Sequence, residues 1–485
     1  MIKFRNAGIL LIIQVLCFPL YGQNVEIYGN APAYKGEKIE FFLSPNPVIH
    51  VDEPVGECLV DSEGDFFCKL NIKKTCRVFI PLEFYRGYFY VIPGNRYELS
   101  LPPPKKKTTE QELNPYFKEV IIHLGILNED KTGLNNLVQK FDDLFYPLLN
   151  DAAINAYIHK TSDYNSIIDT LNSLDDSTAV PFYNNYKKYN IELLKIISSG
   201  FSAKQKKLFS SAELFLDYNN PSCIALINQV FNNYFSKLAR TKEGRRIYAC
   251  INRDRNYFSL LELVKDDLSA SNDSLPELVI LKSIHEGFYQ ERFSNKGLFE
   301  LLDSLQVSTK IAAHRIFAEQ IREDVTRLMK GFPAPDFALE NTADSITELS
   351  TLKGKYVYLG FCSARSYPCM KQFRLLNELL KKFKKNLVIV IVMADNDISI
   401  VKQFAVDYGF EGIVLIAGTR DDILKQYKIK SYPTYYLIDP DGNFLLSSVP
   451  TPEENFESVF WKILNTRHPA SSTVVSTEVD DQQLR

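Results

Sequence analysis

The sequence lacks the features that mark several large classes of protein. Its 56 lysines and arginines nearly balance 59 aspartates and glutamates, so the net charge of -3 gives no electrostatic footprint for nucleic acid. None of the eight cysteines has the C-x2-C spacing of a zinc site, and the six histidines are scattered. We therefore expect no metal and no haem or other cofactor. A phosphate-binding P-loop and a G-x-S-x-G motif are also missing, which argues against nucleotide-driven and serine-hydrolase chemistry.

Long hydrophobic runs are also rare, and the one that exists stands at the N-terminus. A short basic stretch precedes the apolar segment AGILLIIQVLCFPL, and the small residue Gly22 follows it. This order is typical of a secretory signal peptide over residues 1–22 and is short for a membrane span. Cys17 does not indicate a lipoprotein, because Leu16 is large where a lipid-attachment site needs a small residue. We expect cleavage near Gly22 and an exported protein without a further membrane span; an uncleaved N-terminal anchor is the alternative.

The 485-residue chain is too long for one compact core, so two to four domains are expected. Residues 23–104 contain seven short runs with strand-like alternation, separated by turns such as DSEGD, which predicts a β-sandwich. Cys58 and Cys68 flank that turn, and both a disulfide and two buried free thiols are compatible with their positions. The stretch PPPKKK at 102–107 is typical of a linker.

After the linker, the spacing of apolar residues along the chain changes twice. Apolar residues at helical spacing over 108–330 predict an all-α middle region, and we assign no role to its isolated histidines. Residues 331–468 alternate between strands and helices and finish with a hairpin and a helix, as in a three-layer α/β domain. The polar tail at 469–485 is predicted to be disordered.

Three stretches of the α/β segment carry a family resemblance. GFPAPDFAL (331–339) resembles an entry motif G-x-x-A-P-D-F-x-L, and LSTLKGKYVYLGF (349–361) resembles L-S-D-L-K-G-K followed by an apolar strand. YKIKSYPTYYLIDPDGNF (427–444) resembles Y-x-V-x-x-x-P-T-x-x-L-I-D-x-D-G. Together they resemble the exported TlpA/ResA-like branch of the thioredoxin superfamily. The resemblance implies a thioredoxin-like fold, thiol-disulfide oxidoreductase activity on a protein or peptide, a cis-Pro433 facing the active site, and a periplasmic or envelope location.

The stretch FCSARSYPCMKQF departs from the active-site motif of that branch, F-W-A-x-W-C-x-x-C, which often has a Glu three residues on. Ser366 stands in the place of the first cysteine, and Cys369 stands in the place of the second. Cys362 and Arg365 stand in the places of the two Trp, and Gln372 stands in the place of the Glu. Tyr367 and Pro368 fill the two positions between Ser366 and Cys369. Gly360 occupies a position that is often acidic or Asn in the family. The motif is therefore degenerate.

These substitutions predict impaired dithiol exchange. The attacking group must be a thiolate, and the hydroxyl of Ser366 is too basic to replace it at neutral pH. Gln372 removes a carboxylate that could handle protons. A purely structural interpretation is also available, in which Ser366 caps the helix, Pro368 fits its first turn and Cys369 is a small buried side chain.

Two functional hypotheses follow. The first is residual redox chemistry at Cys369, with Cys362 as its partner if their Cα atoms lie within about 7 Å. Arg365 is a cation that could favour a thiolate there, or a solvated loop residue. The second is a non-catalytic module that binds an extended peptide in the groove beside Pro433. The residues expected around that groove are Tyr432, Tyr367, Pro368 and Arg365. The oligomeric state is not indicated by the sequence.

Overall fold

The computed structural model describes residues 24–49, 51–114, 117–159, 164–174, 180–199, 216–239, 241–395, 397–418, 420–447 and 449–467. The predicted signal peptide and the predicted disordered tail lie outside these residues. Across the described ranges, no helix combines the length and the apolar character needed to span a bilayer. The chain divides into two compact units, the first within 1–105, 119–234 and 265–276, and the second within 106–118, 235–264 and 277–485.

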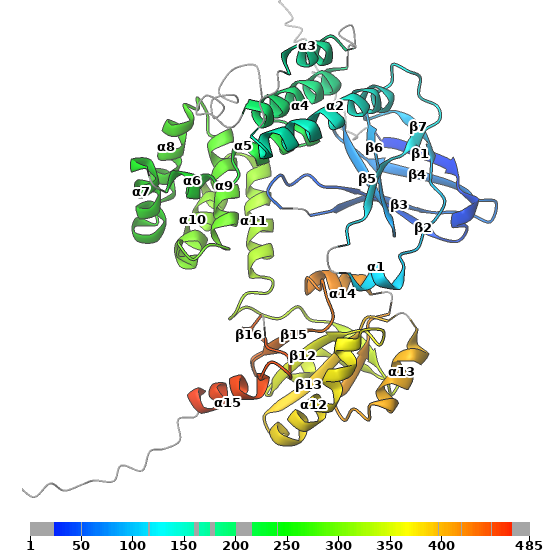
Figure 1. Ribbon diagram of the computed structural model, residues 1–485, viewed down its shortest axis with the longest axis vertical. Coiled ribbons are helices and arrows are strands. Elements are labelled where there is room, and N and C mark those ends of the chain that lie inside the picture. Colours follow the sequence, from blue (N-terminus) through cyan, green and yellow to red (C-terminus); the bar gives the residue numbers. More distant parts are fainter. Residues whose placement is uncertain are drawn as a thin grey trace, which may run out of the picture. The chain divides into compact units, whose positions relative to one another are not determined.

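Two sheets dominate the first unit (Figure 1). One has the order β4-β1-β7-β9, and the other has the order β3-β2-β5-β6-β8. Buried side chains alternate along the strands, and residues from both sheets share one apolar core. The strands are β1 (Asn24–Asn30), β2 (Lys38–Leu43), β3 (Glu53–Leu59), β4 (Asp65–Asn71), β5 (Cys76–Leu82), β6 (Tyr85–Val91), β7 (Arg96–Ser100), β8 (Val120–His123) and β9 (Gly125–Ile126).

The sheets extend beyond the boundary expected at residue 104. Strands β8 and β9 come from the stretch assigned by its sequence to the helical region, and they pair with β6 and β7. They span only four and two residues. Runs this short carry almost no periodic signal, so the sequence pattern could not separate them from the helices that follow.

Cys58 and Cys68 form a disulfide, with their Cα atoms 5.4 Å apart. The structure therefore decides between the two alternatives that the sequence left open. Cys58 lies in β3 and Cys68 in β4, so the bridge joins strands of different sheets. The other cysteines of the described part are buried and form no disulfide: Cys76, Cys223, Cys250, Cys362 and Cys369.

Helices follow the sheets, as the helical period predicts. In the first unit, α2 and α4 enclose an aromatic-rich core that includes Tyr90 of β6. The boundaries between the two units fall within helices α6, α8 and α9, so each of these helices contributes residues to both units. The helices are α1 (Thr109–Leu113), α2 (Leu134–Tyr157), α3 (Asn165–Ser173), α4 (Pro181–Ser199), α5 (Pro221–Val230), α6 (Tyr234–Leu238), α7 (Lys242–Ala249), α8 (Tyr257–Leu268), α9 (Ser274–Gly287), α10 (Asn295–Ser308) and α11 (Ala312–Thr326).

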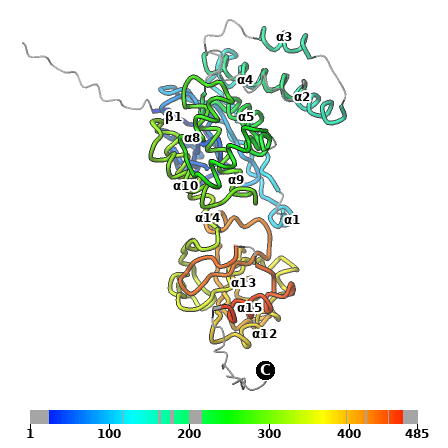
Figure 2. Tube along the Cα trace, turned by 90° about the vertical axis from the view of Figure 1, so that its left-hand side faces the viewer, coloured from blue at the N-terminus to red at the C-terminus, as the bar shows by residue number. Residues whose placement is uncertain are grey.

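A seven-stranded sheet with the order β11-β10-β14-β13-β12-β15-β16 organises residues 331–467. Strands β12, β13 and β14 run parallel, and β15 is antiparallel to β12. Four helices accompany the sheet (Figures 1 and 2). The elements are β10 (Ala338–Asn341), β11 (Ile346–Glu348), β12 (Tyr356–Cys362), α12 (Tyr367–Phe383), β13 (Leu387–Met393), α13 (Ile398–Asp407), β14 (Ile413–Ile416), α14 (Asp421–Gln426), β15 (Thr434–Ile438), β16 (Phe444–Leu446) and α15 (Phe456–Arg467).

Strand β12 is buried on both faces, as its continuous apolar run predicts. Leu359 and Phe361 point into a core shared with α14. Tyr358 and Cys362 point the other way, into a core shared with α12, α13 and α15. Because side chains alternate along a strand, the last residue of β12 directs its sulfur toward the helix that carries Cys369.

Candidate redox site

The motif occupies the connection between β12 and α12. Cys362 ends the strand, and Ser366 is the N-cap residue of the helix, with Pro368 in its first turn. The N-cap position agrees with the structural interpretation of Ser366, but the capping role assigned to its side chain is wrong. The hydroxyl makes no capping bond and donates instead to the carbonyl of Tyr432, at 3.3 Å.

The two cysteines of the motif lie against each other in the core. Both residues have no exposed surface. The thiol of Cys362, the hydroxyl of Ser366 and the amide N–H of Ser363 are all within hydrogen-bonding reach of Cys369 Sγ. The structure thus brings together the three residues that the sequence singled out for chemistry, although no bond joins the sulfurs.

The surroundings shift the pKa values of the two thiols in opposite directions. Burial alone would raise the pKa of Cys369, but the Cys362 thiol and the Ser363 N–H, which donate to its sulfur, and the nearby Ser366 hydroxyl lower that pKa below its ordinary value. Burial and the adjacent Cys369 sulfur raise the pKa of Cys362 well above its ordinary value. Of the two sulfurs, Cys369 is therefore the one that loses its proton more readily.

Asp395 anchors the loop of the motif and was missed by the sequence reasoning. It is 6% exposed, and its carboxylate accepts hydrogen bonds from Ser363 Oγ at 3.0 Å and from the Ala364 N–H at 2.7 Å. It follows β13, which is parallel to β12. The carboxyl ends of parallel strands meet at one edge of a sheet, and this is the signal that could have identified it.

The peptide bond between Tyr432 and Pro433 is cis, which confirms the expectation for Pro433. The side chains of both residues are half-buried. The carbonyl of Tyr432 already accepts the Ser366 hydroxyl, so this part of the predicted peptide-binding groove is engaged within the chain itself.

The other predicted binding residues lie on the surface. Tyr367 is 67% exposed, and the ammonium of Lys371 lies 5.3 Å from the centroid of its ring. Pro368 is exposed beside it. Arg365 pairs with Glu112 of α1, with 3.1 Å between Nη1 and Oε2. Its charge is therefore directed to that carboxylate, and it is not among the groups that set the pKa of Cys369.

Gln372 has a structural role at the position where the family motif often has a Glu. It is buried one turn after Cys369, and its Nε2 donates to Glu453 Oε2 at 3.1 Å. The Glu453 N–H returns a longer bond to the Gln372 carbonyl at 3.4 Å. The amide thus fastens α12 to the segment before α15. Within the described ranges, this site included, no cluster of three or more His, Cys, Asp or Glu residues is arranged to hold a metal ion.

The C-terminal domain is similar in sequence to known thiol-disulfide oxidoreductases. The model of the AhpC/TSA family matches residues 331–445. The chain is 34% identical to the thiol-disulfide oxidoreductase ResA of Bacillus subtilis over 116 residues, which are 24% of this chain and 64% of that protein. It is 36% identical to ResA of Bacillus cereus over 121 residues, covering 24% of this chain and 69% of that protein.

A solved structure of a thiol:disulfide interchange protein from a Bacteroides species is 22% identical to the chain. The match covers 30% of this chain and 97% of that one, with a TM-score of 0.28. The curated matches likewise fall within a quarter of the chain, so they say nothing about the first unit.

Proposed function

Since the chain belongs, through its C-terminal domain, to the ResA family of thiol-disulfide oxidoreductases, we propose that it is an exported envelope protein with a degenerate form of that site. Ser366 stands where the attacking cysteine is expected, so ordinary dithiol exchange at this position is impaired. The remaining redox function belongs to Cys369, with Cys362 as its partner. One observation carries the proposal: the Cys362 thiol lies within hydrogen-bonding reach of the Cys369 sulfur, between the strand and the helix.

The chemistry of this pair balances with a substrate disulfide R–S–S–R as the oxidant. The Cys369 thiolate attacks one sulfur, which forms a mixed disulfide and releases RS⁻. Cys362 then gives its proton to the released thiolate, and its sulfur attacks Cys369 Sγ. The bond to the substrate breaks, the second RS⁻ leaves, and a Cys362–Cys369 disulfide remains. Two electrons have moved from the pair to the substrate.

Access limits the rate of this exchange. Both sulfurs are covered, and the loop above them is held by the hydrogen bonds that Asp395 accepts and by the bond from Ser366 to Tyr432. A substrate reaches Cys369 only when these bonds open. In the family pattern the first cysteine stands at position 366, which is held here by a serine, so we expect slow exchange.

A peptide-level experiment tests the pairing directly. Trypsin cleaves after Lys355, Arg365 and Lys371, so the two cysteines fall on peptides 356–365 and 366–371. We expect mild oxidation of the native chain to yield these two peptides linked by a disulfide, with linkage and insulin reduction both abolished by Cys369→Ala. The matched control is Cys223→Ala, which removes another buried thiol that forms no disulfide and should change neither result.

The opposite outcome supports the second hypothesis. If both thiols stay free under oxidation and no turnover is seen, the redox function is wrong, and the domain is a non-catalytic module that binds peptide beside Pro433. The full burial of both sulfurs and the exposure of Tyr367 favour this alternative. In that case we infer that the two sheets of the first unit form a β-sandwich that, together with the helices, carries the partner surface.

A further inference from the structure

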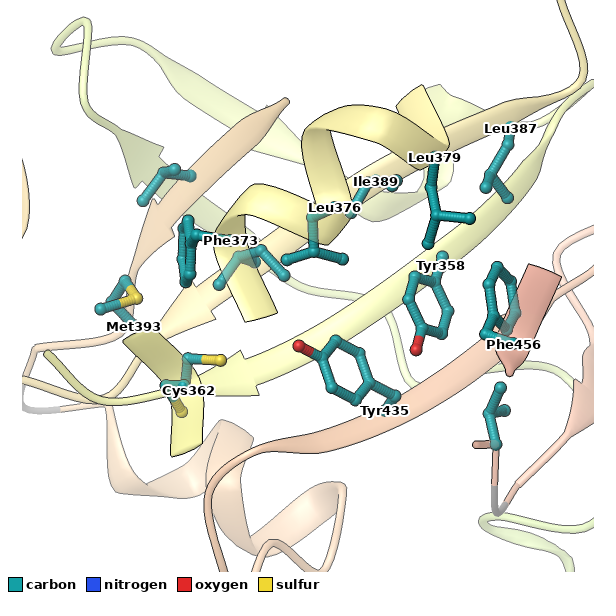
Figure 3. Close-up of a cluster of buried hydrophobic side chains, with 14 of the residues drawn as sticks. Tyr358, Cys362, Phe373, Leu376, Leu379, Leu387, Ile389, Met393, Tyr435 and Phe456 are labelled. Atoms are coloured by element: carbon teal, nitrogen blue, oxygen red, sulfur yellow. The ribbon is translucent and has the colours of Figure 1, made fainter. Parts of the chain in front are cut away.

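Tyr435 places a buried hydroxyl next to the redox pair, and its neighbour there is the sulfur of Cys362. The residue is 3% exposed, and within the described part of the chain its hydroxyl makes no hydrogen bond of ordinary geometry. Figure 3 shows the hydroxyl directed toward the sulfur of Cys362. Burying a hydroxyl without a partner is unfavourable, so a group placed in this way calls for an explanation.

The position of the ring depends on Gly360. Strands β12 and β15 place Gly360 directly opposite Tyr435, two residues before Cys362 on the same face. A Cβ atom at Gly360 would lie 2.6 Å from Tyr435 Cε1 and 2.7 Å from Ile391 Cδ1. The absence of a side chain therefore lets the ring lie across β12 and extend its hydroxyl toward the end of the strand.

A second tyrosine fixes the ring in this orientation. Tyr358 stacks on Tyr435 with 4.7 Å between ring centroids and 9° between the ring planes. The Tyr358 hydroxyl is satisfied, because it donates to the Pro450 carbonyl at 2.9 Å. Two stacked tyrosines on one face thus differ in a single respect: one hydroxyl has a carbonyl acceptor, and the other faces a sulfur.

We propose that Tyr435 is a further catalytic residue of this site, which donates a hydrogen bond to Cys362 Sγ whenever that sulfur is a thiolate. Gly360 serves as the positioning residue that leaves space for the ring. The inference rests on the proposed redox function. A thiol is a weak acceptor and leaves the hydroxyl unsatisfied, whereas a thiolate is a strong one. The donor is thus arranged for the charged state of Cys362.

This donor acts at one step in each direction. During oxidation, Cys362 has given its proton to the released RS⁻, and Tyr435 stabilises the thiolate that attacks Cys369 Sγ and expels the second RS⁻. During reduction, an external thiolate attacks Cys369 Sγ, the bond between the two cysteines breaks, and Cys362 leaves as the stabilised thiolate. Burial and the Cys369 sulfur raise the pKa of Cys362, and contact with Tyr435 opposes that rise.

The test separates the two chemical steps. The full-length reduced chain is mixed with oxidised glutathione, quenched with acid at intervals, and analysed for the glutathione adduct at Cys369 and for the linked peptides 356–365 and 366–371. In Tyr435→Phe we expect adduct formation at the wild-type rate and disulfide closure slowed about tenfold, as befits a lost hydrogen bond to a charged group. The control Tyr358→Phe loses a hydroxyl from the stacked ring and should close at the wild-type rate.

A second variant keeps the hydroxyl but moves it. Gly360→Ala forces the Tyr435 ring aside, so closure should slow as in Tyr435→Phe, and combining the two changes should add little. Closure at the wild-type rate in Tyr435→Phe would overturn the role of Tyr435 while leaving the redox pair intact. A wild-type chain that forms the adduct but never closes would instead overturn the proposed function itself. If Gly360→Ala does not fold, Tyr435→Phe alone decides.

Discussion

The molecule contains two pairs of neighbouring cysteines, and they are in opposite states. Cys58 and Cys68 are joined covalently between strands of two sheets, and Cys58 is only half-buried. Cys362 and Cys369 have their sulfurs close together, fully buried and unbonded. Proximity alone therefore does not decide whether two cysteines are joined. The second pair has hydrogen-bond donors that favour a charged sulfur, which is what the proposed redox role requires.

The largest expected effect comes from restoring the missing thiol with Ser366→Cys. Residue 366 is the N-cap of α12, where the helix dipole lowers the pKa of a cysteine, and Cys369 follows three residues later. We expect insulin reduction to rise from a low level to clear turnover, and Cys369→Ala to abolish that gain.

The control for this gain is Ala364→Cys, which adds a thiol to the same loop away from the helix terminus and keeps the backbone N–H that Asp395 accepts. It should produce no increase. If Ser366→Cys itself produces none, the site lacks more than its attacking group, and the contrast between the two cysteine pairs reflects only their burial.

The second effect is on stability and concerns the bridged pair. Replacing both Cys58 and Cys68 by serine should reduce the free energy of unfolding of the first unit by about 3 kcal/mol, because the unfolded chain gains conformational freedom. Urea unfolding is followed by far-ultraviolet circular dichroism and by the fluorescence of Trp461, the single tryptophan, which lies in α15.

We expect an early transition in circular dichroism and an unchanged Trp461 midpoint. Dithiothreitol should destabilise the wild-type chain in the same way and leave the double variant unaffected. Equal loss of stability in both signals would show that the bridge supports the whole chain, and the contrast between a local structural pair and a separate reactive pair would fail.

The smallest effect concerns Cys223, a buried cysteine outside the candidate site. Burial raises the pKa of Cys223 to about 12. A group whose folded pKa is raised contributes stability that is complete below its unfolded pKa, near 9, and is lost as pH rises toward 12. Each pH unit in this window should cost about 1.4 kcal/mol for this thiol. Urea midpoints at pH 8 and pH 10 should fall less steeply in Cys223→Ala than in the wild type. If the urea midpoint falls equally with pH in the wild type and in Cys223→Ala, burial does not raise the pKa of Cys223.

Much of the C-terminal domain could be predicted from the sequence, because strong local patterns coincide with its elements. The apolar run of β12, the amphipathic run of α12 and the motif around Pro433 each depend on neighbouring residues. The partners of the cysteines could not be predicted in the same way. Asp395 and Tyr435 reach the site through strand pairing with β12, a relation between distant segments that periodicity does not encode.

The hydroxyl of Ser366 illustrates a different limit. Its residue type and position both favour a capping bond, yet tertiary structure offers it the Tyr432 carbonyl 66 residues away. The roles of Gly360 and Arg365 were likewise decided by contacts with Tyr435 and Glu112, which lie elsewhere in the chain.

The bridge between β3 and β4 also bears on self-association. These strands lie at the edges of their respective sheets, and an edge strand offers unpaired N–H and C=O groups to any other chain. Beside the bridged cysteines, Leu59 is 65% exposed and Phe67 is 48% exposed. While the sulfurs are joined, the two edges are fastened to each other. Reduction of the bridge would release two edge strands that carry exposed apolar side chains, so a reducing environment should favour aggregation of this protein.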